Sequence, residues 1–146
     1  MKQLIWKLVL TLTLLSFVIL RKWWYVFPVD GPESMMSGFP LPYICDGWHT
    51  SMSNQFFVME MILDLLLYFM FWFLGILFIN SIVKIKMPKI LTIVLMMFNV
   101  MILCFFIFIA RMPENVFKMK RDFDMEIKKT GYNFIWENTQ RPEIQE

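Results

Sequence analysis

Residues 65–79, with the sequence LLLYFMFWFLGILFI, decide the class of this protein. Every residue in the stretch except Gly75 is aliphatic, aromatic or methionine, and none carries a charge. A helix needs about 20 apolar residues to cross the hydrocarbon core of a bilayer. With its less apolar flanks the stretch extends over residues 56–83, which we predict to be the second of three transmembrane helices.

Two further apolar stretches flank this one. Residues 90–110, ILTIVLMMFNVMILCFFIFIA, predict the third transmembrane helix, and the short connection from Lys84 to Lys89 predicts a tight antiparallel hairpin of the second and third helices. Residues 1–20, which are mostly apolar, predict the first helix. Lys7 interrupts the apolar stretch near its start, where the ammonium group can extend to the headgroups. The cations and aromatic rings of residues 21–25, RKWWY, favour an uncleaved membrane helix over a signal peptide.

The overall composition agrees with a membrane protein. Hydrophobic residues make up 58% of the 146 residues and charged residues 18%, against about 45–50% and about 25% in soluble domains. A soluble domain of this size could not bury so much apolar surface. The formal net charge of +2 is too small to indicate nucleic acid as a partner.

The remaining segments complete an expected all-α integral membrane protein. Turn-forming Gly and Pro residues in residues 21–55 predict an ordered surface loop, which includes GFPLPY at residues 38–43. Apolar residues at helical spacing, followed by Gly131, predict a C-terminal amphipathic helix over residues 112–130. An aromatic tail follows, so residues 112–146 form one segment of amphipathic helix and tail.

Ionisable residues in the second helix are the first candidate site. Glu60 and Asp64 are four residues apart and share one helix face, to which Tyr68 also belongs. Acids inside a span are costly and seldom face lipid. They indicate either a proton or cation path, or a structural polar contact with a partner subunit or with this chain's own loop.

Polar and aromatic residues elsewhere indicate contact surfaces. Asn99 lies in the middle of the third helix, where an amide usually joins helices by hydrogen bonds. Tyr132, Phe134 and Trp136 alternate and would point the same way in an extended chain. We expect a partner-docking surface on the tail, formed by Phe123, Ile127, Tyr132, Phe134 and Trp136.

Nothing in the sequence indicates catalysis or a cofactor. Cys45, Asp46 and His49 lie close together in the loop, but they match no nucleophile motif, and adjacency in sequence does not establish a triad. A single His and two Cys do not indicate a metal site. We therefore expect no enzyme activity, no cofactor and no metal.

These observations predict a small accessory subunit of a larger membrane protein complex. Its partners would be other membrane protein subunits and the lipid bilayer, with a bacterial inner membrane as the expected location. Three lysines in the hairpin connection, Lys84, Lys86 and Lys89, favour a cytoplasmic N-terminus under the positive-inside rule. The alternative is a component of an oligomeric transporter or proton-conducting complex that uses Glu60 and Asp64, and a membrane-surface enzyme using Asp46 and His49 is a third hypothesis.

Overall fold

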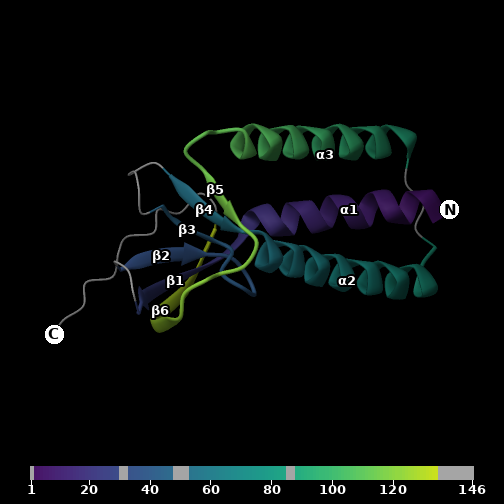
Figure 1. Ribbon diagram of the computed structural model, residues 1–146. Coiled ribbons are helices and arrows are strands. Elements are labelled where there is room, and N and C mark those ends of the chain that lie inside the picture. Colours follow the sequence, from purple (N-terminus) through teal and green to yellow (C-terminus); the bar gives the residue numbers. More distant parts are fainter. Residues whose placement is uncertain (1, 30–32, 48–52, 85–87, 135–146) are drawn as a thin grey trace. The chain divides into compact units, whose positions relative to one another are not determined.

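The described part of the protein contains three helices and six strands (Figure 1). A computed structural model describes residues 2–29, 33–47, 53–84 and 88–134, with side chains from residue 6 to residue 132. The helices are α1 (Lys2–Ile19), α2 (Val58–Ile82) and α3 (Lys89–Ala110). The strands are β1 (Leu20–Pro28), β2 (Ser34–Ser37), β3 (Ile44–Asp46), β4 (Asn54–Phe57), β5 (Val116–Lys118) and β6 (Met125–Phe134).

The prediction of an all-α protein is wrong. Six strands form one sheet in the order β5-β4-β3-β2-β1-β6. All neighbouring strands are antiparallel except β4 and β5, which are parallel. Parallel neighbours need a long crossover connection, and here the chain between β4 and β5 contains α2 and α3.

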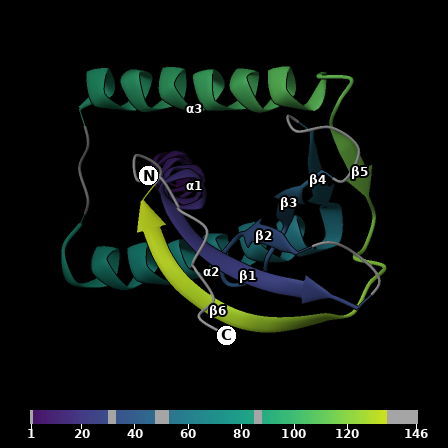
Figure 2. The ribbon, with the colours of Figure 1, turned by 90° about the vertical axis from the view of Figure 1, so that its left-hand side faces the viewer.

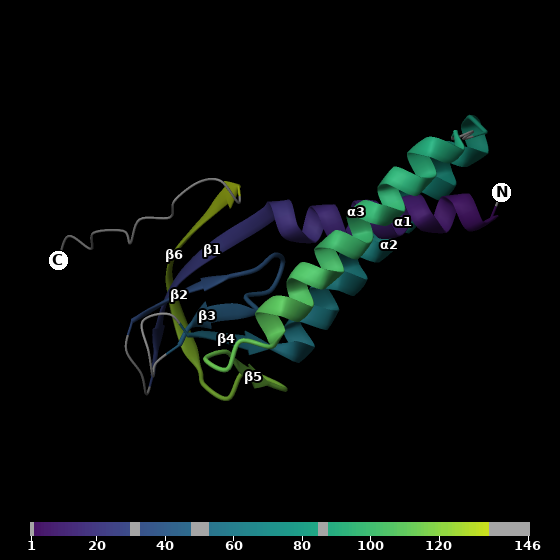
Figure 3. The ribbon, with the colours of Figure 1, turned by 90° about the horizontal axis from the view of Figure 1, so that it is seen from above.

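The segment expected to be a surface loop, residues 21–55, instead supplies nearly all of β1, all of β2 and β3, and the first half of β4. The aromatic and β-branched residues of β1, LRKWWYVFP, favour an extended backbone. β1 follows α1 without an intervening loop (Figure 3). The cations and aromatic rings of residues 21–25, which favoured an uncleaved helix over a signal peptide, are therefore residues of a strand.

The predicted helix over residues 112–130 is also wrong, because this segment supplies β5 and most of β6. β6 pairs along β1 from Phe134 opposite Leu20 to Met125 opposite Pro28, and the two strands lie side by side in Figure 2. The register shifts between Tyr25 and Val26, where Lys128 is the extra residue of a β-bulge. Pairing between residues more than a hundred positions apart leaves no local sequence pattern.

Gly131 was expected to end that helix, but it lies inside β6 opposite Trp23. A Cβ atom added to Gly131 would lie 2.5 Å from the Trp23 ring. The indole thus occupies the space above the glycine, so this position requires Gly for close approach.

The core of the sheet unit consists of side chains from four neighbouring strands. Val26, Met36, Cys45 and Phe57 are almost completely buried. Further apolar side chains pack against them, namely Trp24, Phe123 and Met125.

The helices form a second compact unit, composed of the chain up to Phe17 and from Leu65 to Arg111. The second and third helices were predicted to form a tight hairpin, but α1 lies between α2 and α3 (Figures 1 and 2). Side chains of α1 hold both neighbours: Ser16 accepts a hydrogen bond from the Trp72 indole of α2, and Thr11 accepts one from the Asn99 amide of α3.

Two of the three helices are long and apolar enough to cross a membrane: α2 with 25 residues and α3 with 22. At 1.5 Å per residue these helices are about 37 Å and about 33 Å long. The apolar part of α1, Trp6–Ile19, is shorter and does not reach the same criterion. The positions of α2 and α3 coincide closely with the predicted second and third spans.

Candidate functional site

Asp64 is the most deeply buried ionisable side chain among the described residues of α2. It has no solvent-exposed surface. Its Oδ1 atom accepts a hydrogen bond of 3.0 Å from the backbone N–H of Leu41, and the backbone N–H of Phe39 also donates to the carboxylate. The acid therefore binds a segment of its own chain that precedes it by more than twenty residues.

The segment that Asp64 binds, residues 38–43, is shaped by Gly38. Its φ of +147° is rarely adopted by L side chains, and an added Cβ would lie 2.1 Å from the Leu41 carbonyl oxygen. The Gly38 N–H donates to the Lys22 carbonyl at 3.0 Å, and its carbonyl accepts from the Trp24 indole N–H at 3.1 Å. This loop is thus bonded to both β1 and α2.

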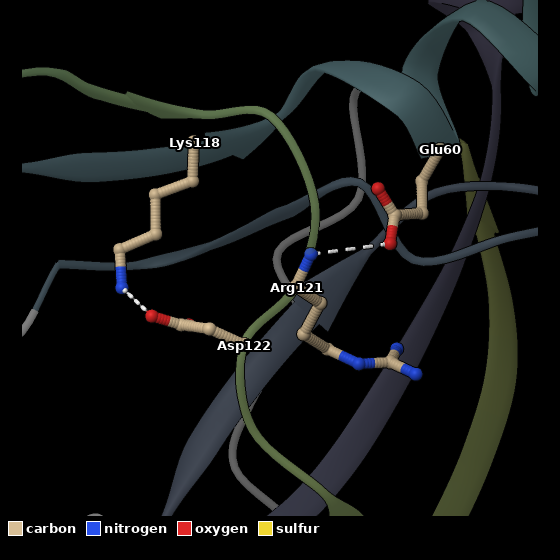
Figure 4. Close-up of polar contacts among 4 residues, drawn as sticks. All are labelled: Glu60, Lys118, Arg121 and Asp122. Carbon is tan, nitrogen blue, oxygen red and sulfur yellow. Dashed lines mark hydrogen bonds and ion pairs between the residues drawn. The ribbon is translucent and has the colours of Figure 1, made fainter.

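Glu60 lies one turn before Asp64 and contacts a different segment. Its Oε1 atom accepts a long hydrogen bond of 3.4 Å from the backbone N–H of Arg121 (Figure 4). The Arg121 guanidinium points away from this carboxylate, and its Nη1 donates to the sulfur of Met125 at 3.6 Å. The backbone N–H of Met59 donates to the Met119 carbonyl at 3.0 Å, which fixes the same connection between β5 and β6.

An ion pair lies within this connection. The Lys118 ammonium is 2.6 Å from the Asp122 carboxylate (Figure 4). The hydrogen bond from Lys118 lowers the pKa of Asp122. Because both side chains are well exposed, the pair contributes little to stability.

Each of the two α2 carboxylates also has one oxygen that is unsatisfied. Glu60 Oε2 and Asp64 Oδ2 are buried and have no hydrogen-bond partner within the described part of the chain. A buried carboxylate oxygen without a donor is costly. Chemically, the pair can anchor two loops with one set of oxygens and receive a proton or cation with the other.

Tyr68, the third residue of the predicted polar face, belongs to the helical unit. Its ring is 8% exposed and packs edge-to-face against Phe17 of α1, with 6.4 Å between ring centroids. Tyr68 therefore contributes an aromatic contact between α1 and α2.

Asn99 also joins helices. Its Nδ2 donates to Thr11 Oγ1 at 2.8 Å, and the Thr11 hydroxyl donates to the Lys7 carbonyl at 2.8 Å. Asn99 Oδ1 has no partner among the described residues. The bond links α3 to α1. The sequence alone identified Asn99 as an interhelical residue but did not identify Thr11 as its partner.

Sequence reasoning missed the second polar link of the helical unit. The Trp72 indole N–H donates to Ser16 Oγ at 2.8 Å. Trp6 of α1 stacks on Phe69, with ring centroids 5.7 Å apart. The signal was present, since Thr11 and Ser16 are polar residues in the mostly apolar part of α1, and polar residues in such helices favour the helix interface.

The residues expected to dock a partner have different environments. Phe123 packs on Phe57 in the sheet core, with 5.9 Å between centroids, so it is part of the fold. Ile127 is 47% exposed and Tyr132 69% exposed, and the Tyr132 ring contacts Phe39. Phe134 ends β6, but its side chain and all of Trp136 lie outside the described parts.

Of the three residues considered for catalysis, the structure describes Cys45 and Asp46. Cys45 is 1% exposed, and burial, together with the nearby Asp46 carboxylate, raises the pKa of its thiol to about 12. A thiol in this state is a poor nucleophile. Asp46 is at the exposed end of β3, and His49 lies outside the described residues.

Among the described residues, no group of three or more His, Cys, Asp or Glu side chains could hold a metal ion. Comparison with known proteins adds no further assignment. The chain matches no protein-family model, no curated protein and no solved structure.

Proposed function

We propose that this chain is a non-catalytic subunit of a larger membrane protein complex, held in the bilayer by its helices. The observation that carries the proposal is the exposure of the apolar helices. Only 17% of the most apolar stretch of α2 and 6% of that of α3 is buried. A core helix of a soluble protein would be mostly covered, whereas a helix in lipid or against partner helices exposes apolar side chains.

Particular side chains make this exposure clear. On α3, large apolar residues are exposed along the whole helix, from Ile90 at 77% through Met97 at 69% to Phe108 at 63%. Water would not solvate such a surface favourably, since each buried Å² of apolar surface contributes about 25 cal/mol. Lipid chains and partner helices are the environments that fit it.

Chain connectivity supports a defined membrane topology. β4 directly precedes α2, β5 follows α3, and the two strands pair with each other. A helical pair that crosses twice returns the chain to the side where it began, so the whole sheet can form on one side of the membrane. We propose that α2 and α3 make these two crossings, with the connection between them on the cytoplasmic side of a bacterial inner membrane.

The accessory role is supported by the chemistry of the described side chains. Asp64 and Glu60 each bind a loop of the sheet unit, and Asn99 binds Thr11, so these polar groups have structural partners. The buried thiol of Cys45 is unsuited to nucleophilic attack. Exposed surfaces of the helices, together with Ile127 and Tyr132 on β6, remain for contacts with other subunits.

The test is purification of the full chain from membranes in a mild detergent, followed by mass spectrometry of everything that co-purifies. We expect stoichiometric membrane protein partners. A variant with Met97→Ala and Met101→Ala on α3 should reduce their recovery, whereas Glu126→Ala on β6 serves as an exposed control. Recovery of the chain alone, at its monomer mass, would contradict the proposal.

A second candidate function is favoured by two buried carboxylate oxygens, Glu60 Oε2 and Asp64 Oδ2, that have no hydrogen-bond partner among the described residues. In a proton- or cation-conducting complex these oxygens would carry the transported charge. The variants Glu60→Gln and Asp64→Asn should then abolish flux in proteoliposomes while assembly persists. Unchanged flux in both variants would exclude this function.

A further inference from the structure

The start of β1 carries two cations that pair with no acid among the described residues. α1 ends at Ile19 and β1 begins at Leu20, so Arg21 and Lys22 are the second and third residues of β1. Within the described part of the chain, the ion pairs involve other residues, and no carboxylate pairs with either of these cations. Their positive charge is therefore not neutralised by any of the described carboxylates.

The Lys22 ammonium is held in position by aromatic rings. Its Nζ lies 3.7 Å from the centroid of the Trp24 ring and 5.7 Å from that of the Tyr132 ring. Trp24 is two residues away on the same strand, and Tyr132 lies directly opposite Lys22 on β6. Cation–π contacts restrict the ammonium without neutralising its charge.

The surrounding backbone holds this arrangement in place. Gly38 bonds to the Lys22 carbonyl through its N–H and to the Trp24 indole through its carbonyl oxygen. Phe39 in the same loop packs edge-to-face on Tyr132, with 5.6 Å between centroids. The ammonium group thus lies against aromatic rings whose positions are fixed by these contacts. We call Lys22, Trp24, Phe39 and Tyr132 together the Lys22 cluster.

Its position along the chain indicates the partner. α1 is hydrogen-bonded to both α2 and α3, the two helices that are long and apolar enough to cross a membrane, and β1 follows α1 directly. With α2 and α3 in the bilayer, as proposed above, the cations that follow α1 lie near the headgroups. Tryptophan and tyrosine favour the same layer.

We propose that the Lys22 cluster binds the phosphate of an anionic bilayer phospholipid, and that Arg21, on the opposite face of β1, adds to the positive charge that attracts anionic lipid. This inference rests on the proposed membrane location and adds a specific lipid contact to it. The cations supply charge complementarity, and the aromatic rings supply apolar contact with the glycerol and upper acyl region. The contact would fix the depth at which β1 leaves the bilayer.

The full chain in detergent, titrated with phosphatidylglycerol and observed by native mass spectrometry, provides the test. Each basic residue near an anionic lipid surface contributes about a fivefold gain in affinity. The variant Arg21→Gln/Lys22→Gln should therefore bind phosphatidylglycerol at least about fivefold more weakly. The variant Lys128→Gln/Lys129→Gln, which removes the same charge from exposed positions of β6, should bind as the original chain does.

A conservative variant separates charge from folding. Lys22→Arg keeps both the charge and the aromatic contact and should retain phosphatidylglycerol binding. Equal losses in the two double variants would overturn the proposal, as would displacement of the lipid by millimolar inorganic phosphate. A chain that stays folded and monodisperse without detergent would contradict the membrane location itself, whereas a membrane-embedded chain with unchanged lipid binding in Arg21→Gln/Lys22→Gln would contradict only the lipid contact.

Discussion

The Asp64 carboxylate accepts the backbone N–H of Leu41 at 3.0 Å, which joins the first part of α2 to a loop 23 residues earlier. A single buried side chain thereby fixes the connection between β2 and β3. The loop needs this anchor because its proline-rich sequence, GFPLPY, offers few N–H groups for regular pairing. Both Asp64 and the loop were evident in the sequence. A contact between the acid and the chain's own loop was one alternative there, beside a contact with a partner subunit and a proton or cation path.

Removal of this anchor should destabilise the fold. Asp64→Ala leaves the Leu41 N–H without an acceptor, so we expect a loss of about 1–3 kcal/mol in the free energy of unfolding. Asp64→Asn retains an acceptor oxygen and should lose less. Denaturant titration in detergent measures both, with Glu126→Ala as an exposed acid control. Equal stability of Asp64→Ala and the original chain would show that the bond contributes nothing.

A larger residue at Gly131 should disrupt the β1–β6 pairing. Its Cβ would lie 2.5 Å from the Trp23 ring, so Gly131→Ala should cost about 1–3 kcal/mol through overpacking. Thr130→Ala, at the neighbouring exposed position, should cost much less. Thermal unfolding followed by circular dichroism compares the two. If the clash is the cause, Gly131→Ala should be nearly neutral when it is made in a Trp23→Ala background. Persistence of its full cost in that background would argue for another origin.

The Asn99–Thr11 bond should couple α3 to α1. Interhelical hydrogen bonds in membranes contribute about 0.6–2 kcal/mol. A double-mutant cycle with Asn99→Leu and Thr11→Val, measured by unfolding in mixed detergent, should give a coupling energy in that range. Ser16→Ala, which removes the acceptor for Trp72 on α2, should show no coupling to Asn99→Leu. Additive effects of Asn99→Leu and Thr11→Val would contradict a direct bond.

Cys45 should resist alkylation. With the pKa of its thiol near 12 instead of 9.0, the thiolate fraction at pH 8 is lower by about a thousandfold. In a Cys104→Ser background, iodoacetamide should therefore modify Cys45 only after unfolding. Rapid labelling of the native protein at pH 8 would show that the thiol is not buried.

The same thiol predicts an alkaline loss of stability. Between pH 9 and pH 12 the unfolded thiol has released its proton while the folded thiol retains it. The unfolded state then binds fewer protons, so the free energy of unfolding falls as pH rises. Cys45→Ala should remove this part of the pH dependence, and an unchanged slope between pH 9 and pH 12 would assign it to other groups.

Sequence and structure agree where a pattern is local. The apolar runs that predicted the second and third spans correspond to α2 and α3, since a helix needs only its own residues for its hydrogen bonds. The strands were missed because their partners are distant: Trp23 pairs with Gly131. Near the end of the chain, Met119, Phe123 and Ile127 fall at helical spacing, although Phe123 packs in the sheet core and Ile127 is in a strand.

The candidate site was predicted in part for the same reason. Glu60, Asp64 and Asn99 were evident because polar side chains in apolar helices are unusual. Their partners were not, because Leu41, Arg121 and Thr11 become neighbours only when distant segments fold together. Burial also changed the interpretation of Phe123, whose apolar ring suits a docking surface and a core equally well.

The position of α2 and α3 between β4 and β5 has a consequence for biosynthesis. A ribosome releases β1 to β4 first, but the two outermost strands, β5 and β6, emerge only after both apolar helices. Until then the edges of β1 and β4 remain open to incorrect partners. In the proposed membrane location, prompt insertion of α2 and α3 would shorten this exposure, and the sheet would be completed only after both helices have been synthesised.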